Sequence, residues 1–197
     1  MSTPAALPRH AVLVDAIPGA RVRDAVLVVS GALLTALFAQ IAITVPGSPV
    51  PITGQTLAVG IVGATLGARR GAASLGLYAL LGLFLPFYAD GNSGWEIVWG
   101  ASGGYIIGFI FAAYAIGWLA ERGADRNVLL AFLAFVVGQL IIFAFGLVGL
   151  KLATDESWSW TIHNGFTIFI VGGLVKAAIG AVMLPGAWQL VRRFERR

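Results

Sequence analysis

Long apolar stretches, separated by short polar gaps, dominate the pattern of hydrophobic and polar positions along the chain. They lie at residues 24–43, 55–68, 71–89, 103–120, 127–150 and 165–191. A helix that crosses a hydrocarbon core of about 30 Å needs about 20 mostly apolar residues. The pattern therefore predicts an all-α integral membrane bundle of six transmembrane helices. The second stretch is short for a full crossing, so its boundaries are the least certain of the six.

The composition agrees with a membrane protein. Hydrophobic residues make up 58% of the chain and charged residues only 11%, with a mean hydropathy of +0.88. Such a chain has too little polar surface for a water-soluble domain. We predict one six-helix domain over residues 24–191, between a cytoplasmic N-terminal tail (1–23) and a cytoplasmic basic tail (192–197). The chain has no cysteine, which excludes disulfides and thiolate metal sites.

The basic residues predict the orientation. Eleven of the 13 lysines and arginines lie in the N-terminal segment, the second and fourth gaps, or the C-terminus: Arg9, Arg21, Arg23, Arg69, Arg70, Arg122, Arg126, Arg192, Arg193, Arg196 and Arg197. Because such residues gather on the cytoplasmic side, both termini should be cytoplasmic. Basic clusters beside membrane helices touch anionic lipid headgroups, so we expect membrane lipid, and no nucleic acid, as a partner.

No motif indicates catalysis or a bound cofactor. The glycine-rich segment 100–108 lacks the Gly-Lys-Ser/Thr ending of a phosphate loop and predicts a turn into a closely packed helix. The two histidines, His10 and His163, fall on opposite sides of the predicted membrane, so no metal site is expected. We predict that the protein is not an enzyme.

Lys176 is the polar residue that most suggests a site. It lies about 11 residues into the sixth apolar stretch, roughly 16 Å from the outer end of that stretch. A charged group at this depth needs a partner. The predicted spans contain acidic residues only at their cytoplasmic ends, namely Asp24 and Glu121. An anionic ligand is the favoured partner; backbone carbonyls, or a helix that starts later and leaves the lysine shallower, are alternatives.

Two predicted external loops could cover a pocket near that lysine. Gln55 follows a segment stiffened by Pro46, Pro49 and Pro51, and its amide offers both a donor and an acceptor. Asn92 lies in the next external loop, among glycines and aromatic residues. On the first helix, Ala32 and Ala36 are small residues four apart, which suits close internal packing or contact with another membrane protein.

Four strings together resemble a known family. VPITGQTLAV, GATLGARRGAASLGLYALLGLF, GASGGYIIGFIFAA and GLVKAAIGA occur in the order typical of the BioY family, over roughly residues 30–182. That family comprises the biotin-specific substrate-binding (S) components of energy-coupling factor (ECF) transporters. The resemblance implies a six-helix S component in the cytoplasmic membrane that captures biotin from outside. It also implies that Gln55, Asn92, Tyr105 and Lys176 bind the substrate.

The resemblance further implies partners and one departure. Family members work with a membrane scaffold subunit and two cytoplasmic ATPases, which hydrolyse the ATP, and dock through small first-helix residues that match Ala32 and Ala36. Many members have an aspartate three residues before the lysine, where this chain has Gly173. The departure leaves open whether Lys176 meets the carboxylate or the ureido group of biotin. There are two alternative functions. The protein could bind another small anionic vitamin or nutrient, or it could be a membrane scaffold protein without transport activity.

Overall fold

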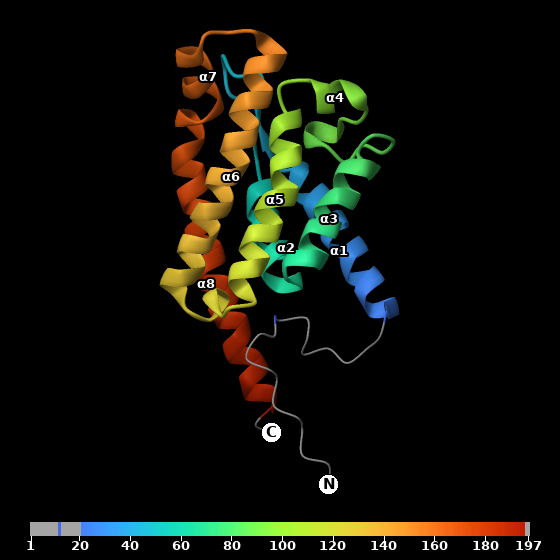
Figure 1. The fold of residues 1–197 in the computed structure, drawn as a ribbon, viewed down its shortest axis with the longest axis vertical. Coiled ribbons are helices and arrows are strands. Elements are labelled where there is room, and N and C mark those ends of the chain that lie inside the picture. Colours follow the sequence, from blue (N-terminus) through green and yellow to red (C-terminus); the bar gives the residue numbers. More distant parts are fainter. Residues whose placement is uncertain (1–11, 13–20, 196–197) are drawn as a thin grey trace.

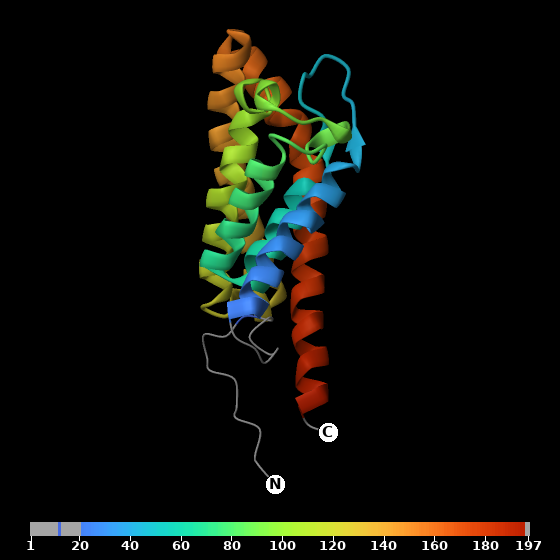
Figure 2. The ribbon, with the colours of Figure 1, turned by 90° about the vertical axis from the view of Figure 1, so that its right-hand side faces the viewer.

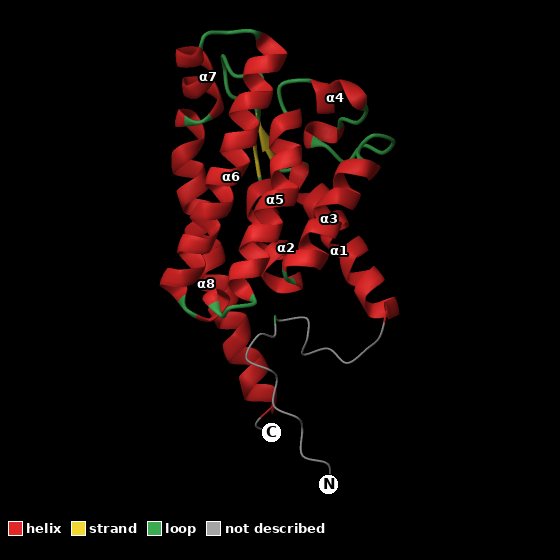
Figure 3. Cartoon of the chain, in the orientation of Figure 1, coloured by secondary structure: helices red, strands yellow, loops and turns green. Residues whose placement is uncertain are grey.

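The computed structural model describes residue 12 and residues 21–195, and these residues are mostly helical (Figure 3). The helices are α1 (Arg21–Ala39), α2 (Gln55–Leu66), α3 (Ala68–Leu81), α4 (Trp95–Trp99), α5 (Gly103–Ala120), α6 (Val128–Thr154), α7 (Trp158–Gly165) and α8 (Ile170–Glu195), with short 3-10 turns η2 (Ala89–Gly91), η3 (Ala124–Arg126) and η4 (Thr167–Phe169). Two short strands, β1 (Ala42–Ile43) and β2 (Ile52–Thr53), pair antiparallel. The helical class is confirmed, apart from this small hairpin.

The long helices stand side by side in one bundle (Figures 1 and 2). Helix α5 occupies the centre, where it packs against α2, α3 and α6; α8 packs against α2 and α6, and α1 packs against α2 and α3. The hydrophobic core runs along these contacts. Figures 1 and 2 also show that α8 extends past the other helices at the end of the bundle where α1 begins.

The two ends of the bundle differ in charge. The start of α1, the α2–α3 junction, the α5–α6 turn and the end of α8 lie at one end (Figure 1), and these segments carry Arg23, Arg69, Arg70, Arg122, Arg126 and Arg193. We call this the arginine end. The segments 40–54, 82–102 and 155–169 lie at the opposite end, which we call the loop end. The gaps that carry arginines in the sequence thus lie together at one end of the bundle, and the gaps without arginines lie at the other.

The helices differ in their capacity to cross a membrane. Within the described residues, three helical segments are long and apolar enough to span one: Gly103–Ala120, Val128–Thr154 and Trp158–Val191. Helices α2 and α3 have 12 and 14 residues, which gives them lengths of only about 18 and 21 Å. Neither reaches across about 30 Å of hydrocarbon by itself. The helix in the second apolar stretch, α2, is therefore short, as the sequence suggests, and α3 in the third stretch is short as well.

Helix α3 ends earlier than the apolar stretch 71–89 predicts. It stops at Leu81, and the chain turns back at Gly82, where a Cβ atom would lie 2.2 Å from the ring of Tyr88. The Tyr88 hydroxyl donates a 2.7 Å hydrogen bond to the Ala79 carbonyl near the helix end. Hydropathy missed this end because the loop that follows is itself apolar.

The last predicted span is also divided differently. Instead of one helix over 165–191, α7 ends at Gly165 and α8 runs from Ile170 to Glu195. Lys176 is therefore only about 9 Å along α8, not 16 Å into a continuous helix. The predicted tail from residue 192 is helical up to residue 195, while residues 196–197 lie outside the described residues.

Most of the predicted N-terminal tail, including Arg9 and His10, also lies outside the described residues. Val12 is described and is 1% exposed, near the α2–α3 junction at Gly67. This position belongs to the core, so the segment is not wholly a free tail.

Ala32 and Ala36 are both buried, at 0% and 6% exposure, on the inner face of α1. The exposed face of that helix carries larger side chains, including Val29, Leu33 and Leu37. The pair therefore serves internal packing in this structure, as one of the two interpretations expects. Docking of a partner by these two methyl groups stays a prediction, and it would require α1 to turn or separate from its neighbours.

Glycines bring α5 and α6 into close contact. A Cβ atom at Gly104 would lie 2.3 Å from the Phe145 carbonyl oxygen, and one at Gly149 would lie 2.7 Å from the Gly104 Cα atom. Backbone atoms of one helix thus occupy the space that a side chain on the other would need. Association in lipid depends on such close packing because lipid tails are as apolar as the side chains themselves.

We predict that Gly104→Ala destabilises the bundle by about 1–3 kcal/mol, because the new methyl group meets backbone that cannot rotate away. Gly76→Ala in α3 is the matched control, since no heavy atom of the described residues outside the nearby backbone of α3 lies within 4 Å of its Cβ position. Thermal unfolding of the purified protein in detergent measures both. Equal melting temperatures for the two variants would contradict the close-contact argument.

A polar contact ties the α5–α6 turn to α8 at the arginine end. The Trp188 indole Nε1 donates a 2.5 Å hydrogen bond to Asp125 Oδ2, and both residues are buried. The Arg126 guanidinium lies 4.6 Å from the centre of the Trp188 ring. Burial raises the pKa of the Asp125 carboxyl above its usual range, and the Trp188 N–H and the Arg126 charge act in the opposite direction.

Trp188→Phe should lower the free energy of unfolding by about 1–3 kcal/mol at neutral pH, because it leaves the buried Asp125 carboxyl without this donor. The deficit should shrink on acidification, since a protonated carboxyl no longer carries a charge that the indole must stabilise. Unfolding measured at several pH values tests both statements. Trp158→Phe, at a side chain that is 54% exposed, is the control, and a deficit no larger than in this variant would refute the role of the bond.

Candidate substrate-binding site

A cavity of about 240 Å³ opens at the loop end of the bundle. The hairpin segment 44–56, the segment 88–97 and helices α5, α6 and α8 all contribute to its wall. The four residues that the family resemblance assigns to the substrate, Gln55, Asn92, Tyr105 and Lys176, all line this one cavity. They come from four separate parts of the sequence, so only the fold brings them together.

The β1–β2 hairpin holds the polar side of the cavity. Ala42 pairs with Thr53 and Ile43 with Ile52, and the Gly54 N–H donates to the Ile41 carbonyl at 2.9 Å. The loop between the strands reaches α7, where the Ser48 hydroxyl donates a 3.0 Å hydrogen bond to the Asn164 carbonyl. The hairpin is thereby fixed at both its base and its tip.

Lys176 contacts this hairpin directly. Its Nζ atom donates a 2.7 Å hydrogen bond to the Thr53 carbonyl oxygen, and the side chain is only partly exposed. No ion pair to a carboxylate occurs at Lys176 among the residues that the structure describes. Lys176 therefore has the backbone-carbonyl partner that one of the alternatives expects. Because an ammonium group has three N–H donors and Thr53 takes one, the others can meet a ligand.

Gln55 is the first residue of α2 and is buried at 6% exposure. Its Nε2 donates a 2.5 Å hydrogen bond to the hydroxyl of Tyr78, and its Oε1 accepts a 2.8 Å hydrogen bond from the Thr53 hydroxyl. Tyr78 is fully buried and packs edge to face against Tyr88. Gln55 is thus held in one orientation, with a second Nε2 N–H left over for a ligand.

Tyr105 contributes mainly its ring to the cavity. Its hydroxyl donates a 2.8 Å hydrogen bond to the Gly165 carbonyl at the end of α7, so it is already engaged. A Cβ atom at Gly146 of α6 would lie 2.3 Å from the Tyr105 ring, which shows how closely the ring packs on that helix. Tyr105 therefore joins α5, α6 and α7 behind the cavity.

Asn92 lies at the rim. It is exposed, and its Nδ2 donates a 2.8 Å hydrogen bond to the Ala89 carbonyl within the same turn. Asp90, also exposed and in the cavity wall, has a φ angle of 56° in the left-handed region. The rim is therefore polar and lies on the segment that follows α3.

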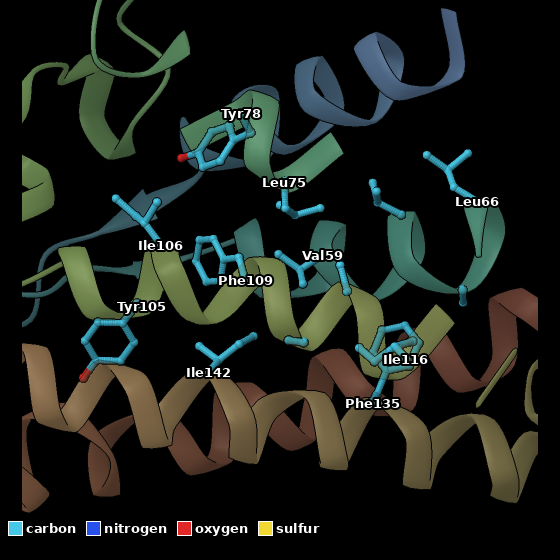
Figure 4. Close-up of a cluster of buried hydrophobic side chains, with 14 of the residues drawn as sticks. Val59, Leu66, Leu75, Tyr78, Tyr105, Ile106, Phe109, Ile116, Phe135 and Ile142 are labelled. Carbon is cyan, nitrogen blue, oxygen red and sulfur yellow. The ribbon is translucent and has the colours of Figure 1, made fainter. Parts of the chain in front are cut away.

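The deeper wall is apolar. Ile106 and Phe109 of α5 and Ile142 of α6 line the cavity and belong to the buried core. Figure 4 shows Ile142 and Tyr105 between α5 and α6, with Ile106 and Phe109 on the other face of α5. Phe143 and Phe169 complete this apolar wall and lie with ring centres 6.3 Å apart. An apolar floor with a few polar groups on one side is the usual form of a small-molecule site.

Sequence reasoning missed several polar residues of the cavity, among them Gln139 and Thr56. Gln139, in the middle of α6, is 8% exposed and donates a 3.0 Å hydrogen bond from Nε2 to the Gly173 carbonyl. Thr56 also lines the cavity, and its buried hydroxyl has no hydrogen-bond partner among the described residues. The signal for Gln139 was a single glutamine within the uncharged run 127–150. Thr56 had no signal of its own beside Gln55.

Metal binding has little to support it in the part of the chain that the structure describes. These residues contain no group of three or more His, Asp or Glu side chains that could hold an ion. Of the two histidines, His10 lies outside the described residues.

The model of the BioY family matches residues 9–193, nearly the whole chain. The chain belongs to the BioY family. This confirms the resemblance that the four sequence strings indicate. Since the relatives are transporters and the chain has several apolar helices able to cross a bilayer, it is a multi-pass membrane protein.

Two relatives and one solved structure illustrate the similarity. Biotin transporter BioY2 of Lactococcus lactis subsp. cremoris is 34% identical over 154 residues, 78% of this chain and 83% of that protein. Biotin transporter BioY of Rhizobium etli is 36% identical over 168 residues, 77% of this chain and 89% of that protein. The crystal structure of an S-component for biotin from an ECF-type ABC transporter has a TM-score of 0.76 at 23% identity, covering 90% of this chain and 93% of that one. The fold is therefore that of an S component.

Proposed function

We propose that this protein is the substrate-binding component of an ECF-type biotin transporter and that it holds biotin in the cavity at the loop end. Membership of the BioY family and relatives that are biotin transporters support the substrate. The fold shared with a biotin S-component supports the mode of action. Binding and delivery, without a chemical reaction, make up the proposed activity.

The single observation that carries the proposal is the position of Lys176. Its ammonium group is held beside the cavity by a backbone carbonyl and has no carboxylate partner among the described residues. A charge in this position favours a ligand with an anionic or strongly polar group. Biotin has both a carboxylate and a polar ureido group, and its fused rings and aliphatic chain suit the apolar floor.

Gln55, Asn92 and Tyr105 complete the proposed site. Gln55 offers an N–H from a fixed amide, Tyr105 offers an aromatic face, and Asn92 lies at the rim, where a substrate would enter. The same wall would also accept another small anionic vitamin, which is the second candidate. A purely structural membrane protein would have no need of a cavity that combines these groups.

The energy for transport would come from partners. We propose that the chain works with a membrane scaffold subunit and cytoplasmic ATPases, which hydrolyse ATP, as in an ECF-type system. The proposed topology has six spans. We place both termini in the cytoplasm because the arginines lie at the end of the bundle where α1 begins and α8 ends. The cavity would then open to the outside.

Lys176→Ala should weaken biotin binding by about 10- to 100-fold, the range for losing a hydrogen bond from a charged group. Binding of radiolabelled biotin to the purified protein measures this. Lys151→Ala is the matched control, because it removes a lysine at the same end of the bundle that pairs with Asp155 at 3.0 Å, outside the cavity. No saturable binding by the parent would refute the proposed function, and equal affinity in parent and Lys176→Ala would remove Lys176 from the site.

Cysteine labelling should confirm the topology, since the native chain has no cysteine to interfere. Ser93→Cys, at an exposed position of the loop end, should react with an impermeant maleimide added to intact cells. Arg122→Cys, exposed at the arginine end, should react only after the membrane is permeabilised. The reverse pattern would overturn the orientation.

A further inference from the structure

Gln139 presents an unused hydrogen-bond acceptor beside Lys176. Its Nε2 donates to the Gly173 carbonyl, and this contact orients the side-chain amide, since only the NH₂ group can face a carbonyl. The Oε1 atom therefore points elsewhere. No hydrogen bond to Oε1 occurs among the described residues, and the residue lines the cavity.

The fold makes room for this amide through Gly173. A Cβ atom at Gly173 would lie 3.1 Å from Gln139 Oε1 and 3.3 Å from both Cδ and Nε2. These separations are tighter than ordinary van der Waals contact, so a Cβ atom at 173 would shift the amide by a few tenths of an ångström. Gly173 and Lys176 are three residues apart on α8 and share one face of that helix. The amide thus lies over α8 within a turn of the lysine.

The contact with Gly173 does not explain by itself why a glutamine is present. A carbonyl inside a helix has its own N–H donor four residues further on, so Gly173 needs no second donor. Burying an amide among apolar residues is costly unless both its donor and acceptor are used. On its other side, Gln139 borders a second cavity of about 130 Å³ whose remaining lining residues are apolar or glycine. The free Oε1 therefore finds polar partners only toward the main cavity.

We propose that Gln139 is a substrate-binding residue whose Oε1 accepts a hydrogen bond from a ureido N–H of biotin, and that the ureido carbonyl accepts one from Lys176. This inference rests on the proposed function. A carboxylate has no hydrogen to donate, so it gains nothing from Oε1, whereas a cyclic urea carries N–H groups on either side of its carbonyl. An acceptor and a donor one helical turn apart match that pattern. The carboxylate then lies away from Lys176, toward the rim.

Isosteric ligands test the assignment. In two cyclic carbamate analogues of biotin, an oxygen replaces one or the other ureido N–H with little change in size. The parent protein should bind one of them at least about tenfold more weakly than biotin, because two acceptors would then face each other. Biotin methyl ester, which loses the carboxylate charge, should bind within about threefold of biotin.

Two variants and a control complete the experiment. Gln139→Met keeps the length of the side chain and removes its polar atoms, so it should bind biotin about tenfold more weakly than the parent and no longer distinguish the carbamates. Gly173→Ala should reduce the same discrimination, because the new methyl group would shift the amide. Gly172→Ala should resemble the parent, because its Cβ would meet only Ile52 Cγ2, at 3.9 Å.

The outcomes separate the two proposals. A parent that does not bind biotin refutes the proposed function and this inference with it. A parent that binds biotin, with Gln139→Met retaining full discrimination against the carbamates, refutes the inference alone. A large loss of affinity for biotin methyl ester, with the carbamates binding as tightly as biotin, would also refute the inference alone. A lower melting temperature of ligand-free Gln139→Met, with unchanged relative affinities, would assign Gln139 a structural role only.

Discussion

The hydrogen bond between Lys176 and the Thr53 carbonyl links the parts of the protein on which the site depends. It joins α8 to the β1–β2 hairpin, and it holds a positive charge that forms no ion pair among the described residues. Moving an ammonium group away from bulk water costs free energy, so a lysine in this position indicates a functional role such as ligand binding.

The short helices α2 and α3 make space for this arrangement. Because they are only about 18 and 21 Å long, they stop short of the loop end reached by α6 and α8. The hairpin and the segment 82–102 fill part of the remaining volume, and the cavity is what they leave open. Glycine contacts such as Gly104 with Gly149 keep the longer helices close enough to form its wall. The site is therefore a consequence of unequal helix lengths in a tightly packed bundle.

Much of the fold follows from the sequence, because hydropathy and the placement of arginines reflect the two solvents that the chain meets. α5 begins and ends where its apolar stretch does, and α6 nearly so. The end of α3 at Leu81 and the break between α7 and α8 were not predictable in this way, since they depend on how Tyr88 and Tyr105 pack rather than on polarity. The hairpin strands are too short to leave a periodic signal.

The site was predictable where a residue is unusual for its surroundings. Lys176 stands out in any membrane span, whereas Gln55, Asn92 and Tyr105 were found through the family motifs, and the structure places all four around one cavity. Gln139 escaped because a lone amide in an apolar helix has many structural explanations. Its partner on α8 is a glycine, which carries no side-chain signal at all. Only coordinates show that the two are adjacent.

Gly173 and Gln139 depend on each other. The space that a side chain at position 173 would occupy is taken by the Gln139 amide, so a larger residue at 173 and a glutamine at 139 cannot both keep these positions. The family resemblance implies that many members have an aspartate three residues before the lysine; the acceptor that we propose for this chain is instead the neutral Gln139 oxygen from α6. A neutral acceptor leaves the charge of Lys176 uncompensated, which increases its pull on a polar or anionic substrate. On this proposal, the exchange alters the charge of the site and keeps an acceptor for the same ligand group.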